Sequence, residues 1–144
     1  MIEGVLITPL SIFETSGGKV LHAMKKTSRG FDSFGEAYFS EVDIGAIKAW
    51  KRHKEMTLNL IVPRGQIRFV LFDDRNKINK QFQEVVISKE NFSRLTVPPL
   101  IWVGFQNLSE EISVILNIAN IEHEPDEVER IGLDKIEFKW SNEK

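Results

Sequence analysis

The sequence contains no cysteine, and its 144 residues carry no marked excess of charge of one sign. Without cysteine, a disulfide framework and a zinc site with thiolate ligands are both excluded. The 19 lysines and arginines stand against 21 acidic residues, which gives a net charge of about −2. Because no basic field is present, we expect neither nucleic acid nor an anionic membrane as a partner.

Long apolar runs are absent as well. No stretch of the sequence approaches the roughly 20 apolar residues that a membrane-spanning helix needs. The first residues, Met1-Ile2-Glu3-Gly4, lack the basic start and the apolar core of a signal peptide. We therefore predict a cytoplasmic protein. With 42% hydrophobic residues, the chain is expected to form a single globular domain over residues 1–144.

Most segments of the sequence have the residue pattern of β-strands. Short β-branched or aromatic segments recur between turn-forming residues such as Ser16-Gly17-Gly18 and Pro98-Pro99, a spacing typical of sandwiches and barrels. The expected strands are residues 4–9, 19–24, 35–42, 46–50, 57–62, 66–73, 82–87, 94–97, 102–107 and 112–120. Only residues 124–130 have a helical pattern, with Pro125 at its first turn. This organisation predicts an all-β jelly-roll barrel with little helix.

The segment from Gly45 narrows the prediction further, since it reads G-A-I-K-A-W-K-R-H-K-E-M-T-L-N-L-I-V-P-R-G. Its spacing resembles the first motif of the cupins, whose fold is the double-stranded β-helix. In metal-binding cupins four side chains converge inside the barrel, and the resemblance places these positions at Lys51, His53, Leu58 and Val103. Only the histidine is a suitable ligand, so we predict no bound metal and no other cofactor.

The same segment also resembles the dTDP-4-dehydrorhamnose 3,5-epimerases, the sugar-epimerase branch of the cupins. Residues 45–51 lie over the hallmark G-V-L-R-G-L-H of that family, and Asp73-Asp74-Arg75 is similar to its V-D-L-R. Val97-Pro98-Pro99 and Gly104-Phe105 continue the likeness. The resemblance implies a cytoplasmic homodimer that takes part in deoxysugar and polysaccharide biosynthesis. It also implies a nucleotide-sugar or other anionic carbohydrate ligand.

The chemistry implied by the resemblance is removal of a proton next to a ketone, which requires a base, an enolate stabiliser and an acid. The family's basic histidine falls on Lys51 of this chain. Lys51 and His53 are two residues apart and share a strand face, so either can act as the base. Tyr38, the only tyrosine, is the candidate acid. The other family positions fall near Leu58, near Ile121 or Glu122, and on Val103.

The predicted substrate-binding residues are Lys48, Asn59, Arg75 and Asn117. Lys48 and Arg75 are positive positions that the resemblance places near a diphosphate. On strand parity, Trp50 lies on the face opposite Lys51, and we expect Trp50 and Trp102 to point outward, where a two-fold partner covers them.

Three functions are compatible with these residues. The first is a metal-independent nucleotide-sugar epimerase or ketoisomerase acting on a 4-keto-6-deoxy sugar nucleotide. The second is a non-catalytic sugar-binding or structural cupin, which the replaced family positions favour. The third is a metal-dependent cupin isomerase or dioxygenase, which the loss of three of the four ligand positions disfavours.

Overall fold

The computed structural model describes residues 1–140, and strands dominate the described chain. The strands are β1 (Leu6–Pro9), β2 (Ile12–Thr15), β3 (Gly18–Leu21), β4 (Glu36–Val42), β5 (Ile47–His53), β6 (Leu58–Arg64), β7 (Ile67–Asp73), β8 (Gln81–Ile87), β9 (Ser93–Val97), β10 (Trp102–Asn107), β11 (Ser113–Ala119) and β12 (Val128–Arg130). Two single-turn 3-10 helices, η1 (Pro125–Glu127) and η2 (Leu133–Lys135), are the only helical elements of residues 1–140. None of these helices is long and apolar enough to cross a membrane.

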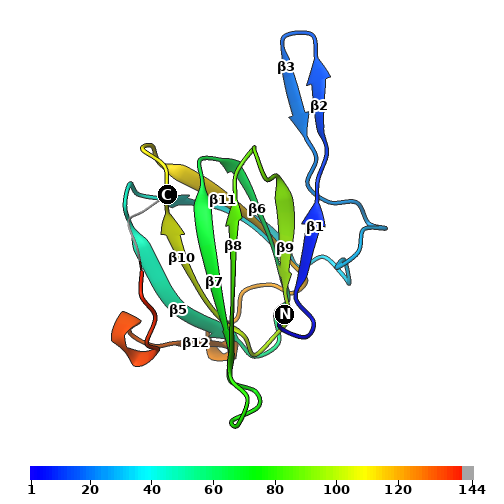
Figure 1. Cartoon of the computed structure of the whole chain (residues 1–144). Helices are drawn as coiled ribbons and strands as arrows, with labels where there is room; N and C mark the ends of the chain where they lie inside the picture. The colour runs from blue at the N-terminus through cyan, green and yellow to red at the C-terminus, as the bar shows by residue number, and fades with distance from the viewer. Residues whose placement is uncertain (141–144) are drawn as a thin grey trace.

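Two five-stranded antiparallel sheets form the body of the molecule (Figure 1). The first sheet has the order β1-β9-β6-β11-β4, and the second has the order β12-β5-β10-β7-β8. From β4 to β12 the chain crosses from one sheet to the other at almost every connection, which is the jelly-roll path of a double-stranded β-helix. The prediction of an all-β cupin barrel is therefore confirmed. The hairpin β2–β3 belongs to neither sheet and projects away from the barrel (Figure 1).

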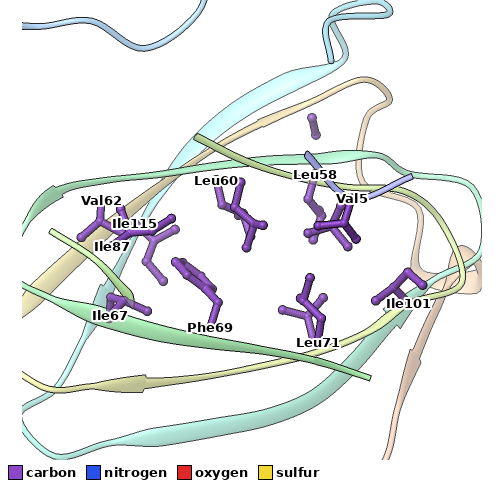
Figure 2. Close-up of a cluster of buried hydrophobic side chains, with 14 of the residues drawn as sticks. Val5, Leu58, Leu60, Val62, Ile67, Phe69, Leu71, Ile87, Ile101 and Ile115 are labelled. Atoms are coloured by element: carbon purple, nitrogen blue, oxygen red, sulfur yellow. The ribbon is translucent and has the colours of Figure 1, made fainter. Parts of the chain in front are cut away.

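The core lies between the two sheets. Figure 2 shows Leu58, Leu60 and Val62 of β6 along one wall, with Phe69 and Leu71 of β7 along the other. All five side chains are at most 7% exposed, and each contributes about 1.5–3 kcal/mol by leaving water. Because successive strand residues face opposite ways, this apolar set fixes the face on which the intervening residues lie.

A second apolar cluster covers the outer face of the second sheet. Trp50 and Trp102 are 2% and 5% exposed, and the C-terminal segment packs over them through Ile136, Phe138 and Trp140. The ring centroids of Trp50 and Trp140 are 5.6 Å apart. The two tryptophans thus point outward as expected, but their cover is this chain's own C-terminal segment. The expectation that a partner subunit covers them is wrong.

The sequence analysis did not predict two of the strands, β2 and β12. The segment 124–130, expected to be helical, forms only the single turn η1 before it extends into β12. There it pairs antiparallel with β5, so that Val128 lies opposite His53 and Arg130 lies opposite Lys51. Pairing with an open sheet edge outweighs the weak local helix signal, because it satisfies the free backbone groups of β5.

Candidate active site

A cavity of about 440 Å³ opens between the two sheets. Strands β4 and β11 of the first sheet contribute Tyr38 and Asn117 to its wall. Strands β5 and β12 of the second sheet contribute Lys48, Lys51 and Arg130, and Ser40 and a set of apolar side chains complete the lining. A largely apolar cavity with a few convergent polar groups is the usual form of a small-molecule site.

A β-bulge in β5 brings two lysines to the same wall. Lys51 lies opposite Val103 of β10, and Lys48 lies opposite Phe105, so three steps along β5 match two steps along β10. Residues directly opposite each other in an antiparallel pair share a face. Lys48 and Lys51 therefore both point into the cavity, although simple alternation would place residues three apart on opposite faces.

Gly104 makes this bulge possible. Both bulged residues, Ala49 and Trp50, lie against it, and a Cβ atom added at Gly104 would stand 2.7 Å from the Cβ of Ala49 and 3.0 Å from the Trp50 ring. No side chain fits in that space, so any residue larger than glycine forces the two strands apart. The glycine at this position is therefore a requirement of the site's backbone.

Lys51 is half-buried and lies among like charges. Burial lowers the pKa of the Lys51 ammonium, and the nearby Arg130 and Lys48 lower it further, while Glu127 acts in the opposite direction. Within residues 1–140, no acidic side chain lines the cavity. A lysine in this setting loses its proton more readily than an exposed lysine and can then act as a base.

His53 and Glu127 form a buried pair behind Lys51. The Nδ1 atom of His53 lies 2.5 Å from Oε1 of Glu127, and the backbone amides of Glu55 and Met56 donate to Oε2 at 2.9 and 3.0 Å. The two side chains are 5% and 4% exposed. Oε1 of this carboxylate fixes the imidazole ring, and Oε2 is occupied by the two backbone amides.

The protonation states of this pair follow from its surroundings. Burial lowers the pKa of His53, although the hydrogen bond to Glu127 opposes that effect. Burial alone raises the pKa of Glu127, but the hydrogen bonds from His53 and the two amides outweigh it and lower the pKa. A neutral His53 then donates its Nδ1 hydrogen to an ionised Glu127. Its Nε2 atom is buried and has no hydrogen-bond partner among the described residues.

Tyr38 and Asn117 face Lys51 from the other sheet. They are direct cross-strand partners in β4 and β11, and Nδ2 of Asn117 donates to the Tyr38 hydroxyl at 3.1 Å. Oδ1 of Asn117 accepts the backbone N–H of Asn59, also at 3.1 Å. Asn117 is therefore held in place from both sides, and it orients the phenol at the cavity wall.

Comparison with known proteins complements this geometry. No protein-family model matches the sequence. The crystal structure of a dTDP sugar isomerase from Desulfovibrio desulfuricans G20 has a TM-score of 0.90 to this chain at 36% identity, over 93% of this chain and 87% of that one. The chain belongs to the dTDP-sugar isomerase family. It is accordingly a sugar epimerase or isomerase.

Two further proteins that are similar to this chain agree with the family assignment. The probable low-salt glycan biosynthesis epimerase Agl13 of Haloferax volcanii is 29% identical over 103 residues, which are 68% of this chain and 66% of that protein. The dTDP-4-dehydrorhamnose 3,5-epimerase of Sulfolobus tokodaii shares the fold, with a TM-score of 0.81 at 19% identity over 99% of this chain and 85% of that one. The predicted resemblance to the 3,5-epimerases is thus confirmed.

The cavity of this family member brings together four of the predicted site residues, namely Tyr38, Lys48, Lys51 and Asn117. His53 lies behind the lining, in the buried pair with Glu127. Two predicted residues lie elsewhere.

Asn59 points to the outer face of the first sheet, because its neighbours Leu58 and Leu60 face inward. Its Oδ1 accepts from Thr96 at 2.6 Å, and its Nδ2 donates to the carbonyl of Gly30 at 3.2 Å. The structure therefore contradicts the placement of Asn59 in the cavity and gives it a role in anchoring the segment around Gly30.

Arg75 also lies outside the cavity. It is an exposed turn residue whose guanidinium pairs with Asp73 at 2.9 Å and donates to the carbonyl of Glu3 at 2.8 Å. Arg75 thus stabilises the turn and does not line the cavity, and its contact with a diphosphate stays a prediction.

The sequence prediction missed two residues of the site, Glu127 and Arg130. Both fall in the segment that was expected to be helical, among several other charged residues. No local signal distinguishes them. Their roles arise only because β12 pairs with β5, which brings Arg130 opposite Lys51.

Proposed function

We propose that the protein moves a proton next to the ketone of a 4-keto-6-deoxy sugar nucleotide, without a metal ion. The observation that carries the proposal is that Lys51 and Tyr38 line one cavity from different sheets. Inversion of a carbon requires that a proton leaves from one face and that another arrives on the opposite face. A base and an acid on separate walls suit that task.

Lys51 is the proposed base. Of the two candidates on β5, it is the one that lines the cavity, and its lowered pKa makes the neutral amine available nearer to physiological pH. His53 acts as a positioning residue behind it. A neutral imidazole held by Glu127 adds no further positive charge beside Lys51, and its buried Nε2 atom has no hydrogen-bond partner within residues 1–140.

The cations of the cavity are proposed to hold the negative charges of the substrate. Lys48 and Arg130 are exposed at the cavity, and no carboxylate of the described residues lines it to compete for them. Such groups suit a diphosphate, and the protonated Lys51 that forms after proton removal stabilises the enolate next to it. Tyr38 then returns a proton from the opposite wall.

Metal independence is supported by the side chains present. Within residues 1–140, no group of three or more His, Asp or Glu side chains is arranged to hold a metal ion. His53 directs one ring nitrogen to Glu127, and the remaining cupin ligand positions carry Lys51, Leu58 and Val103. An ammonium beside two aliphatic groups is a poor donor set for a divalent ion.

We also propose a homodimer built through the hairpin β2–β3. Phe13 and Val20 are cross-strand partners in this hairpin and are 54% and 51% exposed. The edge strand β4 exposes Phe39 to 69%. Large exposed apolar side chains on a projecting hairpin and on an open sheet edge suit contact with a second copy. A single domain and a cytoplasmic location stay predictions.

The test is solvent exchange in D₂O with dTDP-4-keto-6-deoxyglucose, followed by NMR. Deuterium gained at carbon 3 or carbon 5 is the expected result and reports proton abstraction next to the ketone. Deuterium gained at carbon 4, with the ketone moved to carbon 3, would assign 3,4-ketoisomerisation instead. Absence of exchange at all three carbons, with the nucleotide bound, would contradict proton abstraction. Solvent exchange that persists after dialysis of the protein against a chelator supports a metal-independent reaction.

A further inference from the structure

Arg94 is a fully buried arginine on the outer face of the first sheet. Its neighbour Leu95 in β9 packs in the core between the sheets, so strand alternation directs Arg94 the other way. There the segment 22–30 covers it, and the side chain is 1% exposed. Two guanidinium nitrogens donate to the carbonyls of Ala23 and Arg29, both at 2.8 Å.

Within residues 1–140, no acidic side chain forms an ion pair with this buried guanidinium. The two carbonyls carry only partial charges, and Nε of Arg94 has no hydrogen-bond partner within residues 1–140. Burial lowers the pKa of Arg94, and no neighbouring carboxylate opposes that shift. A buried charge without a partner of opposite sign is costly, so the site lacks a negative group.

The surroundings of Arg94 are also positive. Arg94 borders a second cavity of about 270 Å³, the Arg94 cavity, and among residues 1–140 no acidic residue lines it. Lys25, Arg29 and His22 line it together with the hydroxyl residues Thr8, Ser11 and Ser28. Cationic groups interleaved with hydroxyl donors are the chemistry that recognises an oxyanion.

Thr8 adds a second unsatisfied polar atom. It is the direct cross-strand partner of Arg94 in the pairing of β1 with β9, and its Oγ1 atom is buried without a hydrogen-bond partner in the described chain. Two neighbouring buried polar atoms without partners are unusual in a folded protein. Thr8 and Arg94 both line the same positive cavity.

We propose that the Arg94 cavity binds a tetrahedral oxyanion, either free phosphate or the phosphate group of a small phosphorylated metabolite. The cavity shares no lining residue with the candidate active site, and it lies on the opposite face of the first sheet. The inference therefore goes beyond the proposed function and does not depend on it.

The bound anion acts at the base of the projecting hairpin. The backbone N–H of His22, just after β3, donates to the carbonyl of Ser11, just before β2, at 3.1 Å. Both residues line the Arg94 cavity. An anion held there joins β1, β9 and the segment 22–30, and it thereby fixes the direction in which the hairpin leaves the barrel.

The test is titration with inorganic phosphate by isothermal calorimetry, at constant ionic strength in chloride. It is performed on Lys51→Met, because that substitution weakens anion binding in the candidate active site. The expected result is saturable binding of phosphate. Lys25→Gln, which alters an exposed cavity residue, should weaken the affinity about tenfold, as expected for a charge-assisted hydrogen bond. The matched control is Lys26→Gln, which removes a neighbouring exposed charge outside the lining and should leave the affinity unchanged.

A second variant tests the buried side of the cavity. Arg94→Gln removes two loop anchors and risks misfolding, whereas Thr8→Val removes a hydroxyl that makes no hydrogen bond in the described structure. Thr8→Val should therefore retain the circular dichroism spectrum and the thermal stability of the parent while it weakens phosphate binding. Absence of saturable binding, or equal losses in Lys25→Gln and Lys26→Gln, would overturn the proposal.

Comparison of ligands distinguishes the two sources of the anion. Equal affinities for inorganic phosphate and glucose 1-phosphate assign the cavity to free phosphate. An affinity for the sugar phosphate about tenfold higher assigns it to a phosphorylated metabolite. Phosphate binding that persists while sugar exchange fails would refute the proposed function alone.

Discussion

Lys51 and Arg130 lie directly opposite each other in the antiparallel pairing of β5 with β12, and both line the central cavity. Like charges in directly opposite positions destabilise a strand pair. The same repulsion, added to burial, lowers the pKa of Lys51. The arrangement therefore lowers the stability of the fold. At the same time it increases the fraction of Lys51 that is neutral and able to accept a proton, a combination common in active sites.

Replacement of Lys51 by methionine should separate these two effects. Lys51→Met keeps the length of the side chain but removes the ammonium, so sugar exchange should fall by at least about a hundredfold. The free energy of unfolding should rise by on the order of 0.2–1 kcal/mol, because the repulsion with Arg130 is lost. Steady-state kinetics and thermal unfolding measure the two quantities.

The matched control is Arg52→Met. Arg52 lies on the opposite face of β5, where it pairs with Glu129 at 2.9 Å and with Asp74 at 3.3 Å. Its loss should lower stability and leave the turnover of bound substrate intact. Equal loss of turnover in both variants would refute the role of Lys51.

The pH dependence of the rate should follow Lys51. Because a base must be unprotonated, exchange should increase as the pH rises through the lowered pKa of Lys51, and it should level off below the range of an exposed lysine. In that same window the unfolded chain binds more protons than the folded one, so stability should rise with pH. Lys51→Met should abolish that rise in stability, which denaturation at a series of pH values will measure.

Tyr38→Phe tests the proposed acid. Removal of the hydroxyl leaves Lys51 able to abstract the proton but removes the proton donor on the opposite wall, so epimer formation should fall by about 10²–10⁴-fold. Exchange of the same hydrogen with solvent, followed by NMR, should fall much less. Phe39→Leu, on the outward face of the same strand, serves as the control. Parallel loss of exchange and epimer formation would instead assign Tyr38 to binding.

Glu127→Gln should weaken the fold, because the carboxylate accepts hydrogen bonds from His53 and from two backbone amides. The expected loss is about 1.5–3 kcal/mol, the contribution of hydrogen bonds to a charged group. The folded-state pKa of Glu127 is lowered, so its contribution is present above its unfolded-state pKa and is lost as the pH falls through the folded value. The variant should therefore lose less stability than the parent on acidification.

A suitable comparison for this variant is Glu129→Gln. Glu129 pairs with Arg52 on the outer face and is 35% exposed, so its loss should cost only about 0–1 kcal/mol. Urea unfolding of both variants between neutral and acidic pH measures the difference. Identical curves for the two variants would contradict a structural role of the buried pair.

Phe13→Asp tests the hairpin as a dimer contact. A charge on the exposed face of the β2–β3 hairpin should convert the dimer to a monomer in analytical ultracentrifugation, because an unpaired carboxylate resists burial in an interface. Ile78→Asp is the control, since Ile78 is 98% exposed and lies between β7 and β8, away from the hairpin. A dimer that persists in Phe13→Asp would exclude this contact.

The sequence by itself determined the barrel and most of its strands. Alternation and turn residues are local properties of the sequence. Leu58 and Leu60 share one strand face, which predicts that this face is buried. The same alternation predicts that Asn59 lies on the outer face. The segment 45–51, together with the turns and glycines that follow it, indicated the family, because this spacing belongs to the fold. The composition of residues 124–130 favoured a helix, and there local propensity was misleading.

Only the tertiary structure decided how the site is composed. Glu127 reaches His53 across 74 residues of sequence, and Arg130 faces Lys51 because β12 adds to the free edge of β5. The bulge opposite Gly104 turns Lys48 to the same wall as Lys51. These outcomes depend on which strands become neighbours and in what register, and long-range packing sets both, because residues far apart in the chain must bury one shared core.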